Sequence, residues 1–335
     1  MRPIQPKTAL RRADNLSALL ITNLINIRYL TGVDVSAGAM LVTPRSWRLF
    51  VDARYGEMAQ SHIRTGIKVE ERELLARFLE SVPLCGCEEE TVTLAQYRRW
   101  KKNFKNTKFV QLSGMIEDFR RSKDTEELRK FRRAQKITQQ MLTRVPAVLR
   151  PGITERALAW KLTEWAHELK ADGLAFEPIV AFGPHTSRPH HHATDREYRE
   201  GDLVQVDTGA RFGGYCADQS RVFFTGPKTS EQAHVFQAVE EAKDAATKMV
   251  RAGVGTHELD RVARAVLKKH GLEKYFVHSL GHGVGLEIHE GVTLSQKRPN
   301  EKLLKNEIIT IEPGVYLPGK FGMRLEDEIV VEKEG

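Results

Sequence analysis

The stretch Ile308-Ile309-Thr310-Ile311-Glu312-Pro313-Gly314 places an acidic residue at the end of an apolar, β-branched run. The stretch Leu203-Val204-Gln205-Val206-Asp207-Thr208-Gly209 has the same construction. Such runs predict buried strands. A buried carboxylate without a partner is energetically costly, and a single one is usually satisfied by an ion pair. Several such acids in one chain are harder to explain by separate ion pairs.

Three further residues extend this pattern. Asp218 follows the turn Gly213-Gly214-Tyr215, His282 lies in Gly281-His282-Gly283-Val284-Gly285, and Glu326 lies in the stretch 323–331, Met-Arg-Leu-Glu-Asp-Glu-Ile-Val-Val. Four carboxylates with one imidazole suit hard or borderline ions such as Mn²⁺, Co²⁺ or Zn²⁺. Two divalent ions would neutralise the acids together. The sequence therefore predicts a dinuclear metal site.

Taken together, these segments resemble the dinuclear metallopeptidases of the pita-bread fold. Within that group the chain is most similar to the branch that contains prolidase (Xaa-Pro dipeptidase) and aminopeptidase P. The resemblance spans nearly the whole chain. It implies an α+β protein with an α/β creatinase-like N-terminal domain over residues 1–121. Residues 122–335 would form the pita-bread catalytic domain, a duplicated α+β unit with a curved antiparallel sheet.

The resemblance also implies how the two metal ions are held. Asp207 and Asp218 would bind one ion, and His282 and Glu312 would bind the other. Asp218 and Glu326 would bridge both ions. Mn²⁺ is the expected metal, with Co²⁺ and Zn²⁺ as alternatives. Hydrolysis would then use a water molecule that the two ions activate.

Histidines form the second part of the implied site. His190 matches a family histidine that follows a proline and reaches into the site. His289 matches one thought to bond the scissile amide or its tetrahedral product, and His278 matches one that lines the proline pocket. His191 and His192 depart from the small residues usual at their positions, and no role is assigned to them.

Two more residues are expected to act in the site. Glu312, a ligand, is the expected proton carrier. Arg324 shares a strand face with Glu326, because alternate strand residues point the same way, so it can orient a ligand carboxylate or hold substrate. The sequence departs from the family after Asp218, where Ser220 and Val222 replace two threonines.

The expected function is hydrolysis of Xaa-Pro bonds, preferentially in dipeptides. The alternative is an aminopeptidase P that acts on longer peptides, because both activities use the same ligands. The short first domain favours the dipeptidase. A non-catalytic peptide-binding relative would be expected to have lost ligands, and none is lost. A methionine aminopeptidase shares the ligands but lacks the creatinase-like domain.

Composition narrows the remaining classes. The chain has 335 residues and a net charge of +8. No apolar run is long enough for a membrane span, and residues 1–7 lack a signal-peptide core, so we expect a cytoplasmic protein without membrane contact. Three cysteines predict free thiols. A homodimer is expected. The basic, aromatic run 97–109 suits a solvated helix face with its aromatics packed inward better than a nucleic-acid surface.

The pattern along the chain predicts alternating strands and helices in the first domain. Strands are expected at 18–23, 39–43 and 47–52, and helices at 27–32 and from 54. The box Asp124-x-x-Glu127 predicts a helix that runs to about Leu149, followed by a helix over 155–170. The segment 150–154 is echoed at 251–256, each after a long amphipathic helix, which suggests duplication.

Overall fold

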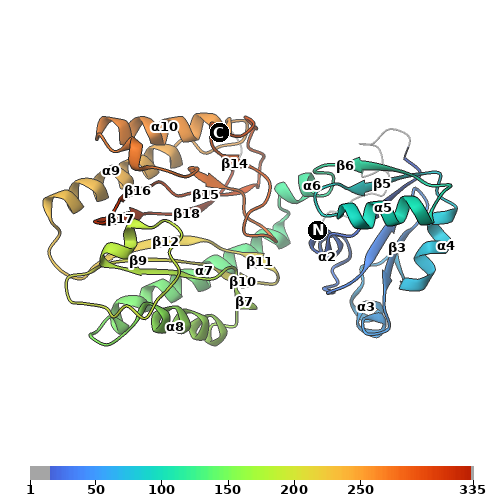
Figure 1. Cartoon of the computed structure of the whole chain (residues 1–335), viewed down its shortest axis with the longest axis horizontal. Coiled ribbons are helices and arrows are strands. Elements are labelled where there is room, and N and C mark those ends of the chain that lie inside the picture. The colour runs from blue at the N-terminus through green and yellow to red at the C-terminus, as the bar shows by residue number, and fades with distance from the viewer. Residues whose placement is uncertain (1–15, 333–335) are drawn as a thin grey trace. The chain divides into compact units, whose positions relative to one another are not determined.

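A computed structural model describes residues 16–332 of the chain. The chain divides into two compact units, whose boundary lies between Arg120 and Arg121 (Figure 1). The expectation about residues 1–7 concerns residues outside the described part. Among the helices of residues 16–332, none is long and apolar enough to cross a bilayer.

The first unit is built around a six-stranded sheet with the order β4-β3-β2-β1-β5-β6. Strands β1–β2 and β2–β3 are antiparallel, whereas the remaining neighbours are parallel. The strands are β1 (Ala18–Ile21), β2 (Ala39–Val42), β3 (Trp47–Val51), β4 (Ile67–Glu71), β5 (Leu84–Glu88) and β6 (Lys108–Leu112). The helices are α2 (Leu24–Thr31), α3 (Gly56–His62), α4 (Leu75–Glu80), α5 (Leu94–Asn103) and α6 (Glu117–Arg121).

The three strands expected in this unit are present. Their side chains point alternately to the two faces of the sheet, and an apolar cluster lies on each face. Leu19 and Ile21 of β1 enter one apolar cluster, and Ala18 and Leu20 enter the other. The first helix begins three residues earlier than expected, because the Asn23 side chain accepts hydrogen bonds from the backbone amides of the first turn. The central strand is therefore apolar on both faces, as in a covered α/β sheet.

The basic and aromatic run forms α5 and the chain that follows it. Trp100 stacks on Phe109 with ring centroids 5.5 Å apart, and Tyr97 meets the same ring edge-on at 6.5 Å. The basic residues of the helix, Arg98, Arg99, Lys101 and Lys102, are exposed. The aromatics are thus part of the core, which confirms the expectation of a solvated helix face. Cys85 and Cys87 of β5 and Cys216 of the second unit are buried free thiols.

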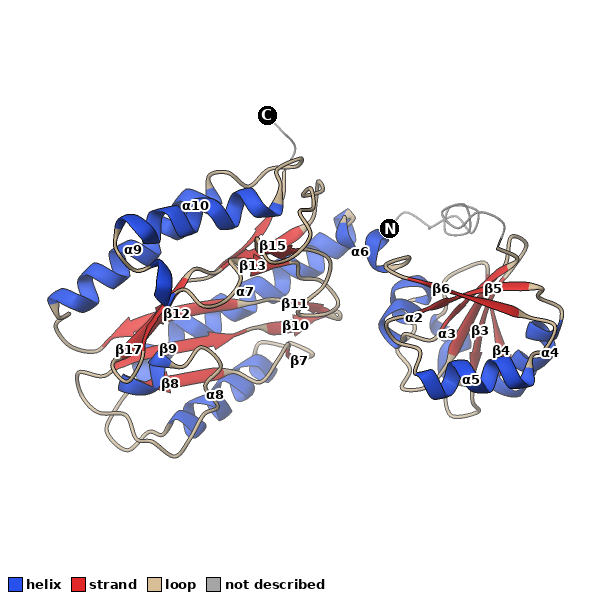
Figure 2. Cartoon of the chain, turned by 45° about the horizontal axis from the view of Figure 1, so that its top comes forward, coloured by secondary structure: helices blue, strands red, loops and turns tan. Residues whose placement is uncertain are grey.

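The second unit places its strands between two pairs of helices, α7–α8 and α9–α10 (Figures 1 and 2). The helices are α7 (Thr125–Val148), α8 (Glu155–Glu168), α9 (Ser230–Thr247) and α10 (Thr256–Lys269). The strands are β7 (Gly173–Leu174), β8 (Ile179–Phe182), β9 (Leu203–Thr208), β10 (Ala210–Phe212), β11 (Tyr215–Cys216), β12 (Gln219–Phe224), β13 (Gly281–His282), β14 (Thr293–Leu294), β15 (Ile308–Ile311), β16 (Gly314–Leu317), β17 (Phe321–Arg324) and β18 (Asp327–Val330).

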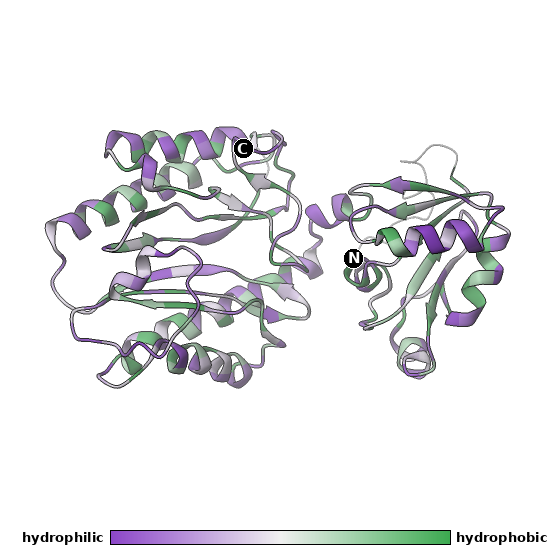
Figure 3. Ribbon diagram, viewed as in Figure 1, coloured by the Kyte–Doolittle hydropathy of each residue, from purple (hydrophilic) through white to green (hydrophobic). Residues whose placement is uncertain are grey.

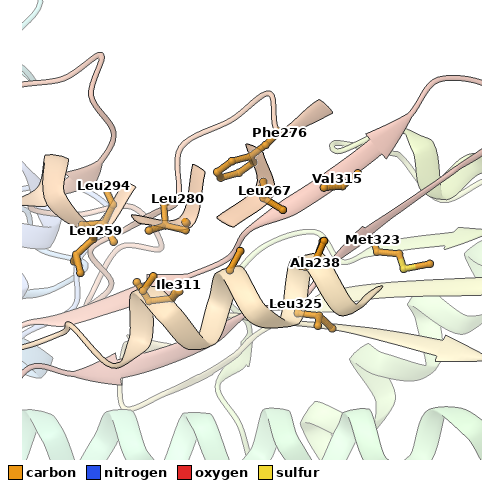
Figure 4. Packing of buried hydrophobic residues seen from close by; sticks show 14 of the residues in the cluster. Ala238, Leu259, Leu267, Phe276, Leu280, Leu294, Ile311, Val315, Met323 and Leu325 are labelled. Atoms are coloured by element: carbon orange, nitrogen blue, oxygen red, sulfur yellow. The ribbon is translucent and has the colours of Figure 1, made fainter. Parts of the chain in front are cut away.

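The echoed segments mark the turn inside each helix pair. Segment 150–154 joins α7 to α8, and segment 251–256 joins α9 to α10. Asp124 and Glu127 form the predicted capping box of α7. Each pair covers its own apolar cluster: α7 and α8 pack on β8 and β9, whereas α9 and α10 pack on β15 to β17 (Figure 4). Hydrophilic and hydrophobic bands alternate along α10, as its buried face requires (Figure 3).

The strands of this unit pair antiparallel throughout the described residues. They form several short ladders instead of one continuous sheet. The stretch 323–331, treated as one strand in the sequence analysis, is interrupted at Leu325 and Glu326. The reason is that the ladder partner of this stretch carries Pro313, which cannot donate a backbone hydrogen bond.

Candidate metal centre

Two antiparallel strand pairs supply the four predicted carboxylate ligands. In the first pair, Asp207 of β9 lies opposite Ser220 of β12. Asp218 immediately precedes β12. Both aspartates are buried, at 6% and 5% exposure. The strand ends thus hold two carboxylates on neighbouring strands of one ladder.

The second strand pair supplies two glutamates that face each other. β15 pairs with β18 and β16 pairs with β17 in one common register. The two ladders are separated by Glu312 and Pro313 on one strand and by Leu325 and Glu326 on the other. Because the register continues across this break, Glu312 lies opposite Glu326.

At the break the Leu325 amide still donates to the Pro313 carbonyl at 3.4 Å, but the two glutamate amides bond to other segments. The Glu312 amide donates to the Leu280 carbonyl at 2.8 Å, and the Glu326 amide donates to the Ser220 carbonyl at 3.3 Å. Like charges directly opposite weaken a ladder, and Pro313 has no amide proton to donate. The break therefore joins the second strand pair to β12 on one side and to the β13 segment on the other.

His282 is held against β15 by a very close strand approach. A Cβ on Gly281 would come within 2.0 Å of the Thr310 carbonyl oxygen, so only glycine fits there. The His282 Nδ1 lies 3.1 Å from the Gly283 carbonyl oxygen, which can only accept. In this arrangement Nδ1 carries the proton, and Nε2 is free to bind a metal.

The structure brings the five predicted ligands together. The His282 Nε2 lies 3.5 Å from an Asp218 oxygen and 3.6 Å from a Glu312 oxygen. Ligand atoms of Asp218, His282 and Glu326 lie within 4.8 Å of one another. The charge of Asp207 raises the pKa of Asp218, and the buried Oδ1 of Asp207 has no hydrogen-bond partner among residues 16–332.

Burial and mutual repulsion raise the pKa of three of these carboxyls. Burial is the main cause for Asp218 and for Glu326, and the neighbouring carboxylates add to it. Burial raises the pKa of Glu312 to about 7. Without cations the cluster therefore keeps protons near neutral pH, and divalent ions binding there would replace them. The donor set and the unpartnered Asp207 oxygen fit such ions.

Arg324 is a buried cation beside the acids. Its guanidinium donates hydrogen bonds to Asp207, to the Ser220 Oγ at 2.9 Å and to the Tyr316 hydroxyl at 2.7 Å. Its Nε lies 3.9 Å from a Glu312 oxygen. These contacts hold the guanidinium between the Asp207 carboxylate and two hydroxyl groups.

The three histidines expected to act on substrate also gather here. The His278 Nε2 lies 3.1 Å from the Tyr316 hydroxyl oxygen. The rings of His289 and His282 are 4.2 Å apart between centroids. His190 is exposed, and its charge contributes to lowering the pKa of both His278 and His289. The preceding residue, Pro189, accepts a hydrogen bond from Arg324 at 3.3 Å through its backbone carbonyl, which brings this segment to the site.

Burial determines the charge state of two of these histidines. It lowers the pKa of His278 to about 3 and that of His289 to about 4. Both side chains are therefore neutral at neutral pH. A neutral imidazole can donate one hydrogen bond and accept another without adding positive charge.

Sequence reasoning misses two buried residues at the site. Glu328 accepts hydrogen bonds from the Asp218 amide at 2.7 Å and from the Gln219 side chain at 2.8 Å. Tyr316 lies between Arg324 and His278. Glu328 is two residues after the proposed ligand Glu326, so strand alternation could have predicted that its side chain faces the site. No pattern in the sequence points to Tyr316.

The metal-free protein should become less stable as the pH rises from about 4.5 to about 7. The pKa of Glu312 in the folded chain, about 7, lies above its ordinary value of 4.5, so folding takes up a proton in this window. Stability therefore falls with rising pH. Urea unfolding in a chelating buffer, at several pH values, measures the slope. Glu312→Gln cannot titrate and should show a shallower loss; equal slopes would contradict the raised pKa of Glu312.

Comparison with known proteins covers both units. The model of Metallopeptidase family M24 matches residues 129–333, and that of the Creatinase/Prolidase N-terminal domain matches residues 7–122. An Xaa-Pro dipeptidase of Pyrococcus horikoshii is 32% identical over 327 residues, which cover 96% of this chain and 92% of the relative.

Solved structures agree with the family models. The Xaa-Pro dipeptidase from Bacillus anthracis superposes with a TM-score of 0.94 at 29% identity, covering 99% of this chain and 94% of that one. The X-Pro aminopeptidase from Thermotoga maritima superposes with a TM-score of 0.89 at 33% identity, covering 97% of this chain and 95% of that one. With its creatinase-like first unit and its cluster of acids and histidines, the chain belongs to metallopeptidase family M24.

Proposed function

We propose that this chain is a metal-dependent peptidase that hydrolyses Xaa-Pro bonds, with dipeptides as its preferred substrates. The observation that carries the proposal is the convergence of Asp207, Asp218, His282, Glu312 and Glu326 beside three histidines and one buried arginine. Relatives named Xaa-Pro dipeptidase in Pyrococcus horikoshii and Bacillus anthracis support the dipeptide preference. The Thermotoga maritima structure, an X-Pro aminopeptidase, keeps the alternative of longer substrates.

Two divalent ions would be held by these five side chains. Asp207 and Asp218 would hold one ion, His282 and Glu312 the other, and Asp218 and Glu326 would be shared. Carboxylate oxygens with a single imidazole favour Mn²⁺, with Co²⁺ and Zn²⁺ as alternatives. When bound, such ions lower the pKa of water and polarise a carbonyl oxygen.

The chain's own residues would supply the proton transfers and the alignment. The Glu312 carboxylate would accept a proton during attack on the peptide carbonyl and return it to the leaving amine. His289 and His190 can donate hydrogen bonds to the oxygen on which negative charge develops. Arg324 keeps Asp207 in place from a fully protein-bound position.

His278 would contact the proline side of the substrate. Its ring meets the Phe276 ring edge-on, with centroids 5.0 Å apart, and it contacts the Tyr316 hydroxyl. Peptidases that bind the N–H of the scissile amide cannot do so at proline, because its nitrogen carries no hydrogen and its ring is rigid. A site that binds the proline ring through aromatic contacts does not need an amide proton on the substrate.

The proposal is tested by comparing kcat/KM for Ala-Pro, Ala-Pro-amide and Ala-Pro-Ala at a fixed metal concentration. A dipeptide presents a free carboxylate close to the scissile bond, and a dipeptidase would gain transition-state binding from recognising it. We expect masking or extending that carboxylate to lower kcat/KM about tenfold or more, equivalent to about 1.4 kcal/mol.

Two outcomes would change the assignment. A higher kcat/KM for Ala-Pro-Ala than for Ala-Pro would make the protein an aminopeptidase P. Cleavage of Met-Ala-Ser in preference to any proline peptide would reject Xaa-Pro specificity altogether. Metal content is measured on the same preparation, so that inactivity from incomplete loading is distinguished from a wrong substrate.

Three finer expectations belong to the same proposal. Manganese as the working metal would show as the highest kcat/KM among Mn²⁺, Co²⁺ and Zn²⁺. A homodimer would appear in sedimentation equilibrium as twice the mass of the chain. Action in the cytoplasm would fit the free thiols of Cys85, Cys87 and Cys216. Each of these stays a prediction.

A further inference from the structure

A second cluster of ligand-type side chains surrounds Glu155, the first residue of α8. The Glu155 side chain is fully buried. Its Oε1 accepts the Phe182 amide at 2.9 Å, and its Oε2 accepts the Thr194 amide at 3.0 Å and the Thr194 hydroxyl at 2.6 Å. One carboxylate thus fastens both ends of the segment 182–194, which includes His190.

Two histidines of the same segment point their ring nitrogens at this carboxylate. The His185 Nδ1 lies 2.8 Å from Oε1, and the His191 Nε2 lies 2.8 Å from Oε2. The two rings are 4.5 Å apart between centroids. The ligand atoms of Glu155, His185 and His191 lie within 4.8 Å of one another, as do those of Asp218, His282 and Glu326.

The charge of Glu155 lacks a strong cationic partner. Burial alone would raise the pKa of Glu155, but hydrogen bonds from His191, Thr194 and the Phe182 amide outweigh it and lower that pKa. The carboxylate is therefore ionised at neutral pH. Within residues 16–332, its ion-pair partners are the imidazoles of His185 and His191, and neither lysine nor arginine pairs with it. A divalent cation would add compensating positive charge beside this buried anion.

We propose that Glu155, His185 and His191 bind a third divalent cation of the borderline class, such as Zn²⁺, separate from the catalytic pair. Two imidazole nitrogens and one carboxylate are a ligand set that zinc accepts, with water completing the tetrahedron. The His185 side chain is 22% exposed and gives the ion a route from solvent. The other ring nitrogens of the two histidines have no hydrogen-bond partner in the described residues, so the displaced protons can occupy them.

The ion would cross-link the segment that carries His190. His185 and His191 lie on either side of His190 in the chain, whereas Glu155 belongs to α8. Coordination by all three would fix this segment to the helix more strongly than hydrogen bonds do. The third ion is thus a structural ion beside the catalytic site.

The test counts zinc ions per chain after equilibrium dialysis and metal analysis. The parent protein should hold about three ions, two of them catalytic. The double variant His185→Asn, His191→Gln should hold about two. Asparagine and glutamine place an amide N–H close to the imidazole nitrogens they replace, so they keep the hydrogen bonds to Glu155 while they remove the metal ligands. His192→Ala is the matched control, because His192 is the neighbouring, exposed histidine.

A second readout is the rise in thermal unfolding temperature on addition of zinc. It should be smaller for the double variant than for the parent and unchanged for the His192→Ala control. Equal zinc counts in the parent and the double variant would overturn the third site. The proposal does not rest on the peptidase assignment: failure of the catalytic pair would remove about two ions from both proteins, whereas failure of the third site would remove the difference between them.

Discussion

Replacement of Glu326 by alanine is expected to lower kcat/KM for Ala-Pro by about 10³-fold or more and to empty the catalytic metal sites. Glu326 lies opposite Glu312 across the break in the second strand pair. It would be shared by both ions, so its loss weakens both at once. Stabilisation of the transition state by a pair of metal ions contributes several kcal/mol, and each 1.4 kcal/mol is about a tenfold change in rate.

The variant Glu326→Gln distinguishes the effect of losing the negative charge from the effect of losing side-chain volume. It keeps the volume of the side chain and removes the negative charge, so it should also bind metal poorly. In the metal-free state both variants should be folded, because each removes one of several mutually repelling acids. Circular dichroism and thermal unfolding in chelator check this, and metal analysis measures the loss of ions.

His289→Ala provides the contrast for the same prediction. The His289 ring packs on the His282 ring but is not among the proposed ligands. Its removal should lower kcat while the metal content stays at the parent level. If His289→Ala lost the metals and Glu326→Ala kept them, the proposed roles of the two residues would be reversed.

Removal of divalent metal should abolish turnover, and adding it back should restore turnover in proportion to the ions bound. The physical reason is that bound divalent ions would lower the pKa of water and polarise the peptide carbonyl. Burial and neighbouring acids raise the pKa of Asp218, Glu312 and Glu326, so these carboxyls would release protons as the ions bind. The carboxyl groups bind the metal ions only in their deprotonated form. The activity of metal-free protein should therefore be at background.

The experiment is a titration of chelated, dialysed protein with Mn²⁺, followed by Ala-Pro hydrolysis at each step. Recovery should end when about two ions have entered the catalytic site. The double variant His185→Asn, His191→Gln should show the same end point, since it alters only the third site. Full turnover in a sample verified as free of metal would refute the dinuclear mechanism.

Local patterns predicted those parts of the protein that local chemistry determines. The acids that end apolar runs, Asp207 and Glu312, stand out because water-seeking groups are unexpected in buried strands. The capping box at Asp124 predicted the start of α7, since it depends on residues within one helical turn. The inward packing of the α5 aromatic residues was also predicted correctly, because it depends on the spacing of residues along one helix.

Other features depend on contacts between distant segments and have no local signature. The position of Glu312 opposite Glu326 follows from the register of the strand pair, and the interruption at Leu325 follows from Pro313 on the other strand. The Glu155 cluster joins α8 to residues far along the chain. The sequence around His191 therefore does not indicate that its side chain contacts Glu155. The contacts of Arg324 with Ser220 and Tyr316 are equally non-local.

The break between the two ladders also bears on how the enzyme assembles. Asp207 and Asp218 come from one strand pair and Glu312 and Glu326 from the other, and the chain between the pairs includes α9 and α10. Closing so long a loop is slow compared with forming a helix. Each strand pair alone supplies only one of the two proposed shared ligands, Asp218 or Glu326, so tight metal binding would require both pairs to be docked. Bound ions would therefore stabilise the state in which both strand pairs have docked.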